Sequence, residues 1–121
     1  MSDAGSVLIW GGDTGLALGL GPANLGDADA PLPESVEAQT CRIIANLDAI
    51  LAANGLSRAH VLGVTIHLTQ FERFHARMRR ALATCWEEDA ALSVVGVTQL
   101  PRDALVQMDV TVTRQPRAAR G

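Results

Sequence analysis

The sequence predicts an α/β fold in which two helices pack on one face of a mixed sheet. Two segments have the periodicity of amphipathic helices, and the segments around them have the alternation or the β-branched runs of strands. Because helices and strands follow one another along the chain, we expect them to build one layered unit. The 121 residues suffice for one core, so residues 1–121 are predicted to form a single domain.

The composition indicates that other subunits cover part of the surface. Apolar residues make up 48% of the chain, and the mean hydropathy is +0.17. Both values exceed what a lone domain of this size needs to fill its interior. The formal net charge is −3, and the sequence has no extended basic stripe, so nucleic acid is not expected as a partner.

The first part of the chain is predicted to hold little regular structure. Ser6 to Trp10 has the β-branched and aromatic residues of a buried strand, and Gly11-Gly12 closes it with a turn. Residues 13–33 are rich in glycine and proline. We expect an ordered loop there, or at most a hairpin with a short strand at 16–18, and little that contributes to a core.

Two helices are predicted. The first runs from Glu34 to Asn54, with Ser35 as its N-cap and Gly55 just beyond its end. The second runs from about Phe71 to Trp86. The residues that it should bury are Phe71, Phe74, Met78, Leu82 and Cys85, with Arg73, Arg77 and Arg80 on the opposite side. That arginine row fits either an anion-binding surface or, more simply, the solvated face of an amphipathic helix.

Three further strands are predicted, at Val61–Thr69, Ala91–Thr98 and Ala104–Thr113. The last two are separated by a turn at residues 99–103 and are expected to pair as a hairpin. In the first of the three, Leu62, Val64, Ile66 and Leu68 should face the helices. The other sheet face carries polar side chains together with the apolar Leu92 and Val94, which indicates a subunit interface that contains a pocket. The polar tail 114–121 is predicted to fray.

Several classes of site and location are not expected. Cys41 and Cys85 both fall in predicted helices and give neither a disulfide framework nor a metal-ligand spacing, so the thiols should stay reduced in a cytoplasmic protein. No glycine run joins a strand to a helix as a phosphate cradle requires, and neither a metal nor another cofactor is predicted. No apolar run approaches the roughly 20 residues that span a bilayer, so no membrane association is expected.

Three motifs in series resemble the YjgF/RidA family, also known for its endoribonuclease L-PSP-like members. They are Glu37-Ala38-Gln39-Thr40 with Asn46-Leu47-Asp48-Ala49-Ile50-Leu51, then Val64-Thr65-Ile66-His67-Leu68-Thr69, then Gln99-Leu100-Pro101-Arg102-Asp103-Ala104-Leu105-Val106. The similarity covers roughly residues 7–113. It implies a chorismate-mutase-like fold and a homotrimer, with clefts between subunits that bind small carboxylated metabolites. The best-known members hydrolyse enamines and imines such as 2-aminoacrylate to keto acids and ammonia.

The positions that carry this reaction in the family differ here. A guanidinium must hold the substrate carboxylate, and a carboxylate must move protons. By ungapped counting from Leu100-Pro101, the family's arginine falls at Leu92, its frequent cysteine at Val94 and its glutamate at Gln107. A serine of the family aligns with Trp10. Ordinary imine deamination by these residues is therefore not expected.

Polar side chains on two predicted strands suggest a changed site. We expect His67, Asp109 and Gln107 to act as catalytic groups, with Trp10, Leu92, Val94, Thr65 and Thr111 binding the substrate. The alternative for His67 is a plain hydrogen bond across an interface, and a filled pocket is the alternative for Trp10. Whether the protein is an enzyme stays open. The functions under consideration are hydrolysis, tautomerisation or dehydration of an unstable metabolite, non-catalytic binding of a metabolite or partner, and residual deamination.

Overall fold

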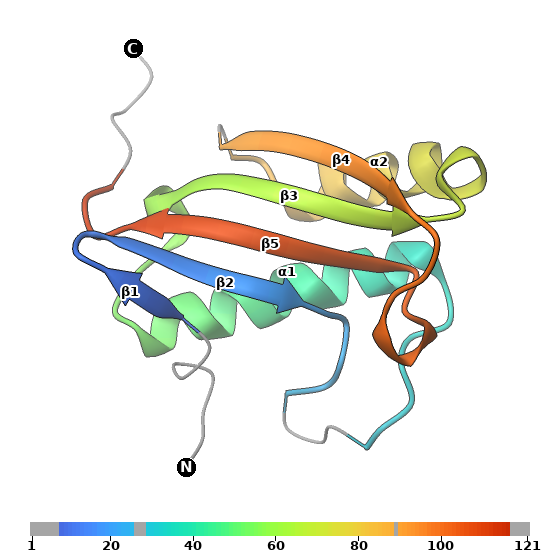
Figure 1. The fold of residues 1–121 in the computed structure, drawn as a ribbon, viewed down its shortest axis with the longest axis horizontal. Coiled ribbons are helices and arrows are strands. Elements are labelled where there is room, and N and C mark those ends of the chain that lie inside the picture. The colour runs from blue at the N-terminus through green and yellow to red at the C-terminus, as the bar shows by residue number, and fades with distance from the viewer. Residues whose placement is uncertain (1–7, 26–28, 89, 117–121) are drawn as a thin grey trace.

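The computed structural model describes residues 8–25, 29–88 and 90–116 as a five-stranded mixed sheet with two helices on one face. Figure 1 looks onto the uncovered face of the sheet, with both helices behind it. The elements in chain order are β1 (Ile9–Gly11), β2 (Thr14–Leu20), α1 (Val36–Ala53), β3 (Val61–Thr69), α2 (Phe71–Cys85), β4 (Ala91–Val97) and β5 (Val106–Thr113). Short 3-10 turns lie at Arg58–His60 and Pro101–Asp103. The predicted two-helix architecture is confirmed.

Some predicted segments reach beyond the described residues. Ser6 and Val7 of the first predicted strand, and residues 117–121 of the tail, lie outside them. In the part of the chain that the structure describes, no helix combines the length and apolar character needed to cross a bilayer.

The ends of α1 follow from its sequence. The Ser35 hydroxyl accepts a hydrogen bond from the Ala38 backbone N–H at 3.0 Å, as an N-cap does. After the helix, Gly55 takes a φ of +71°, a conformation that suits glycine. The backbone N–H of Leu56 then donates to the Leu51 carbonyl at 2.8 Å, which closes the helix end. Both predicted end signals are confirmed.

Helix α2 differs from its prediction at its first residue. Phe71 keeps 37% of its surface exposed and stacks on the His75 ring, with centroids 4.6 Å apart, so the expectation that it is buried is wrong. Its position explains this, because Phe71 packs beside Gly96 of β4 at the edge of the sheet and not over the centre. Phe74, Met78 and Leu82 are buried as predicted, whereas Cys85, the last of the five, is only partly buried.

One member of the arginine row joins the two helices. Arg77 Nε and one terminal nitrogen each donate to the Glu37 carboxylate at 2.8 Å. This hydrogen bonding lowers the pKa of Glu37 from 4.5 to about 2. A lowered carboxyl pKa contributes stability that is present above the ordinary pKa and is lost as the pH falls toward 2. The Arg77 contact supports the solvated-face interpretation of the row.

The strand order β1-β2-β5-β3-β4 corrects the predicted hairpin. β4 pairs in parallel with β3, and β5 pairs antiparallel with both β3 and β2. Parallel neighbours need a long crossover, which α2 supplies between β3 and β4. The connection after β4 contains the turn at Pro101–Asp103, where Arg102 and Asp103 have φ values of 59° and 56°. It carries the chain past β3, so β4 and β5 end on opposite sides of that strand.

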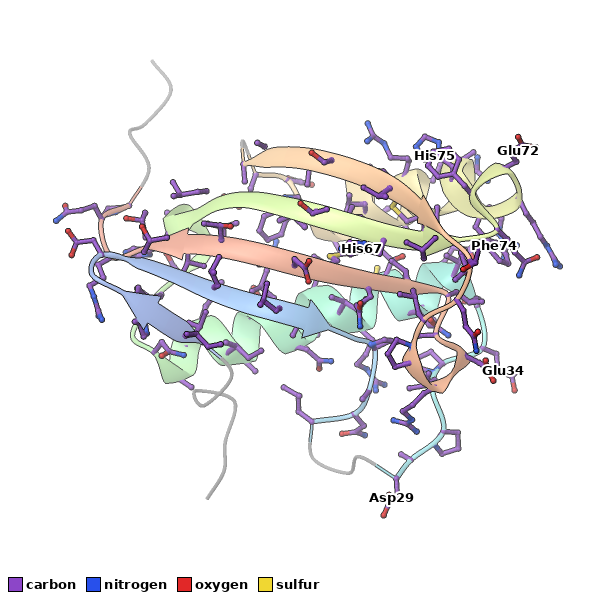
Figure 2. All side chains as sticks on the ribbon, in the orientation of Figure 1. Asp29, Glu34, His67, Glu72, Phe74 and His75 are labelled. Atoms are coloured by element: carbon purple, nitrogen blue, oxygen red, sulfur yellow. The ribbon has the colours of Figure 1, made fainter. Side chains whose placement is uncertain are left out.

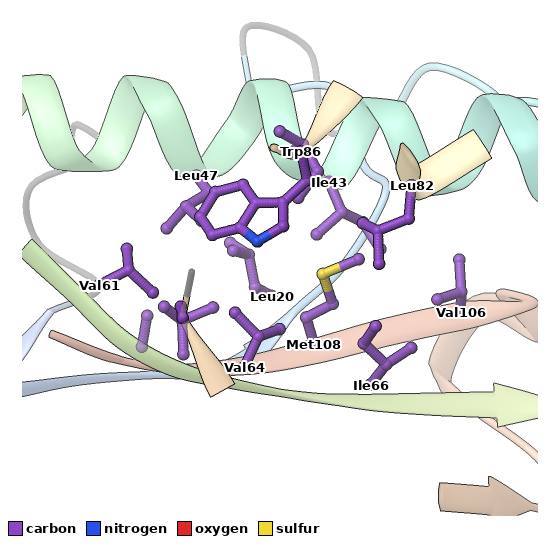
Figure 3. Close-up of a cluster of buried hydrophobic side chains, with 14 of the residues drawn as sticks. Leu20, Ile43, Leu47, Val61, Val64, Ile66, Leu82, Trp86, Val106 and Met108 are labelled. Atoms are coloured by element: carbon purple, nitrogen blue, oxygen red, sulfur yellow. The ribbon is translucent and has the colours of Figure 1, made fainter. Parts of the chain in front are cut away.

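The core lies between α1 and the sheet (Figure 3). The indole of Trp86, at the end of α2, fills the space beside Leu47 and Leu82. β2 contributes more than predicted, because Ala17 and Leu20 are buried and the strand spans seven residues. Of the two predicted alternatives for residues 13–33, the structure has the hairpin, formed by β1 and β2. The expectation that this segment adds little to the core is wrong.

A bulge in β3 overturns one predicted core residue. Val61 pairs with Val112 and Gly63 with Thr111, so two residues of β3 advance against one of β5. The extra residue reverses the alternation at this end of the strand. Val61 is consequently buried, whereas Leu62 is 43% exposed. The prediction that Leu62 faces the helices is wrong.

Candidate functional site

The uncovered sheet face carries five of the eight predicted site residues. Val106, Met108, Val110 and Val112 of β5 are buried toward the helices, so alternation turns Gln107, Asp109 and Thr111 to the open face. Thr65 pairs with Asp109 and His67 with Gln107 in the β3–β5 register. Figure 2 shows His67 over the central strands of the sheet. The two strands thus place these five side chains on one surface.

His67 and Asp109 are in direct contact. Nε2 of His67 lies 3.1 Å from Oδ2 of Asp109. The two side chains are 25% and 36% exposed, so both are partly shielded and still reachable from solvent. When Nε2 carries the proton it donates to the carboxylate, and Nδ1 is then the basic nitrogen. Among the described residues, Nδ1 has no hydrogen-bond partner.

A backbone group that the sequence analysis missed holds the other carboxylate oxygen. The Gly19 N–H donates to Oδ1 of Asp109 at 2.7 Å. The pairing of β2 with β5 shifts register between Ala17 and Leu20, which frees the Gly19 N–H from the ladder. Gly19 has a φ of +65°, which other residues rarely adopt. The only sequence signal for this contact was the glycine-rich composition of residues 13–33.

A shallow pocket of about 220 Å³ adjoins the carboxylate on the open face. Its walls combine apolar side chains of β2 with polar groups of β3, β4 and β5. They include Leu16, Leu18, Thr65, Ser93, Asp109 and Thr111. Leu18 is 60% exposed at the rim of this pocket. The pocket therefore offers an apolar wall, hydroxyl groups and one oriented carboxylate.

Gln107 belongs to a neighbouring hollow. Although it pairs with His67 in the sheet, its side chain lines a separate pocket of about 190 Å³ with Gly19, Pro22 and Pro101. Its amide can donate and accept hydrogen bonds but cannot act as a base at neutral pH. Gly19 lies between the two hollows, because its N–H reaches Asp109 and it lines the second pocket together with Gln107.

The other three predicted residues lie on the helix-covered face. Leu92 and Val94 pair with the buried Val64 and Ile66, and residues paired across neighbouring strands project to the same side. Leu92 accordingly lines a hollow with Leu82 and Trp86. The expectation that Leu92 and Val94 share the open face is wrong, because the parallel register fixes their side.

Trp10 is also separated from the polar pair. It pairs with Gly15, whose missing side chain makes room for the indole beside Val112. The Arg114 guanidinium lies 3.9 Å from the centroid of the ring. Trp10 thus packs against the core at the far end of the sheet, so within one chain it does not join Leu92 and Val94 in a pocket.

The site can hold and move protons. An imidazole oriented by a carboxylate can accept a proton at its free nitrogen and return it, while the carboxylate stabilises the charged ring. Among the described residues, no group of three metal-ligating side chains is present. The arrangement is a hydrogen-bonded histidine and carboxylate beside a small pocket on the sheet surface of an α/β protein.

Sequence comparison assigns this chain to a protein family. The family model described as Endoribonuclease L-PSP matches residues 4–114. A RutC family protein of Aquifex aeolicus is 30% identical over 90 residues, which cover 69% of this chain and 68% of the relative. Protein DfrA of Myxococcus xanthus is 39% identical over 75 residues, covering 61% of this chain and 56% of the relative. The chain belongs to the endoribonuclease L-PSP family, the YjgF/RidA family that its motifs resemble.

Solved structures share the architecture. YyfA of Yersinia pestis, from the Rid protein family, is 27% identical with a TM-score of 0.79, over 88% of this chain and 85% of that one. The YjgF gene product and TdcF with bound serine, both from E. coli, have TM-scores of 0.78 at 21% and 20% identity, over 90% of this chain and 87% of theirs. The last two likenesses concern the fold alone.

Proposed function

We propose that this RidA-like domain binds a small, unstable metabolite at the open sheet face and transforms it by hydrolysis, tautomerisation or dehydration. The observation that carries the proposal is the contact between His67 Nε2 and Asp109 Oδ2, with the second carboxylate oxygen fixed by the Gly19 N–H. All three reaction classes need a proton removed from one atom and delivered to another. The paired imidazole and carboxylate supply that capacity.

The substrate class follows from the walls of the pocket. A space of about 220 Å³ accepts only a small molecule, and its hydroxyl groups at Thr65, Ser93 and Thr111 suit a ligand with polar oxygens. Leu16 and Leu18 would cover an apolar part of that ligand. The structure of TdcF with bound serine gives a precedent for a small metabolite on this fold.

The proposal includes a homotrimer whose subunits complete the cleft. Leu16, Leu18 and Val95 leave much of their surface exposed on the open face, which is costly for a lone chain. A second chain on this face would bury those side chains and deepen the shallow pocket. We propose that the site lies between two chains.

The assembly is tested by native mass spectrometry. We expect a species with the mass of three 12.8-kDa chains. Leu18→Asp places a charge in the proposed interface and should shift the population toward single chains. Leu25→Asp, in the connection between β2 and α1, is the matched control and should leave the trimer intact. A monomeric wild-type protein would remove the interface from the proposal.

The chemistry is tested with a panel of small oxygen-bearing metabolites, such as 2-keto acids, enamino acids and short unsaturated acids. Thermal shift reports binding, and mass spectrometry of the mixture reports product. Binding together with product formation supports an enzyme. Binding without product favours the second candidate, a non-catalytic trimer. That candidate is motivated by Leu92 and Gln107 at positions where the family resemblance implies an arginine and a glutamate.

A further inference from the structure

Two thiols meet between the helices, on the side of the sheet opposite the proposed site. Sγ of Cys41, in α1, lies 3.0 Å from Sγ of Cys85, the last residue of α2. Both sulfurs also point at the carbonyl of Ala81, at 3.8 Å for Cys41 and 3.3 Å for Cys85. Both cysteines are free and only partly buried. The two reduced sulfurs are therefore in contact with each other and accessible to small reagents.

The packing of α1 on α2 keeps the thiols opposite each other. One turn before Cys41, Glu37 receives two hydrogen bonds from Arg77, each 2.8 Å long. Next to Cys85, the Trp86 ring is buried in the core. The Arg58 guanidinium lies 5.1 Å from the centroid of that ring. Arg58 is held in turn by Asp48 of α1. Contacts on both sides of the thiol pair thus fix the register of the two helices.

We propose that Cys41 and Cys85 are an oxidation site, at which a peroxide converts the two thiols into an intrachain disulfide between α1 and α2. The peroxide first oxidises one thiol to a sulfenic acid, and its O–O bond breaks to release water or an alcohol. The second sulfur then attacks the sulfenic sulfur. An S–S bond forms, and the departing hydroxide leaves as water with the proton of the second thiol. Two electrons pass from the sulfurs to the peroxide.

The local chemistry makes Cys85 the natural resolving thiol. Burial, followed by its hydrogen bond with Cys41, raises the pKa of Cys85 to about 12. Near neutral pH this thiol stays protonated, and the protonated form reacts slowly with reagents in solution. Its 3.0 Å contact with Cys41 gives it a high effective concentration beside an oxidised Cys41 sulfur, which compensates for its small thiolate fraction. The pair should therefore cross-link in preference to collecting separate adducts on each sulfur.

The disulfide should stabilise the fold without changing the open face. It closes a loop from residue 41 to residue 85 and so removes conformational freedom from the unfolded chain. The bond needs the sulfurs to approach by about 1 Å, a movement that side-chain rotation can supply. The polar pair at His67 lies beyond the sheet from this site.

The test uses the full-length wild-type protein and hydrogen peroxide. We expect a mass loss of about 2 Da per chain that dithiothreitol reverses. Trypsin should then yield one species that joins the peptides of residues 1–42 and 81–102, which contain the two cysteines. Oxidation should raise the Tm, and dithiothreitol should reverse at least about 5 °C of that rise. Methionine oxidation does not contribute to that part, because dithiothreitol does not reverse it.

Matched variants and a denatured control make the result decisive. Cys41→Ser and Cys85→Ser, checked for folding by circular dichroism, should each lose the cross-link. Three results would each overturn the proposal. They are oxygen addition without any cross-link, cross-links between different chains only, and a joined peptide that forms only when the protein is unfolded in urea. The wild-type peptide map distinguishes these outcomes even where a variant fails to fold.

Discussion

Asp109→Asn is expected to lower turnover of the substrate found in the metabolite panel by about 10²–10⁴-fold. Asparagine keeps the size of the side chain and can still accept from the Gly19 N–H. It removes the negative charge that orients the His67 imidazole. Initial rates measure the effect. Substrate binding, read by thermal shift, should change far less than the rate.

The matched control for this substitution is Asp13→Asn. Asp13 lies in the exposed turn between β1 and β2, and its backbone carbonyl, which the substitution leaves in place, accepts from Arg114. His67→Ala should lose as much turnover as Asp109→Asn, and the double variant should lose little more than either, because the two groups act as a unit. A rate above half of wild type in Asp109→Asn would remove the pair from the mechanism.

Leu47→Ala is expected to lower the free energy of unfolding by about 2–5 kcal/mol. Leu47 lies in α1 with none of its surface exposed, packed where Trp86 and the sheet meet (Figure 3). Truncation removes buried methyl groups and leaves a cavity that close-packed neighbours fill only in part. Urea denaturation followed by circular dichroism measures the loss.

The control for this prediction is Leu25→Ala, in the connection between β2 and α1. Leu25 keeps 50% of its surface exposed, so the same truncation should cost below about 0.5 kcal/mol. If both variants lost equal stability, the core would not lie where the structure places it.

The helices were predictable because their signals are local. A capping serine at position 35 and a glycine at position 55 act on neighbouring backbone groups, and the sequence shows both directly. The alternation of β5 is local in the same way, which is why the polar face with Asp109 could be predicted. These residues depend little on which strand lies beside them.

Features that depend on strand pairing could not be derived from the sequence. Leu92 faces the helices only because β4 pairs in parallel with β3. Leu62 is exposed because of a bulge, and the Gly19 N–H reaches Asp109 because of another. In each case the side that a residue faces is set by register, and register is fixed by contacts between segments distant in the chain.

Decay of 2-aminoacrylate tests most directly whether the protein has departed from the reaction that its family resemblance implies. The enamine is generated in the presence of the purified protein, and pyruvate formation is followed against buffer alone. Because Leu92 and Gln107 occupy the positions expected of the arginine and the glutamate, we expect pyruvate to form at the buffer rate. A clear acceleration by the wild-type protein would contradict this expectation. If Asp109→Asn accelerated the decay equally, the protein would be a deaminase that works through other residues.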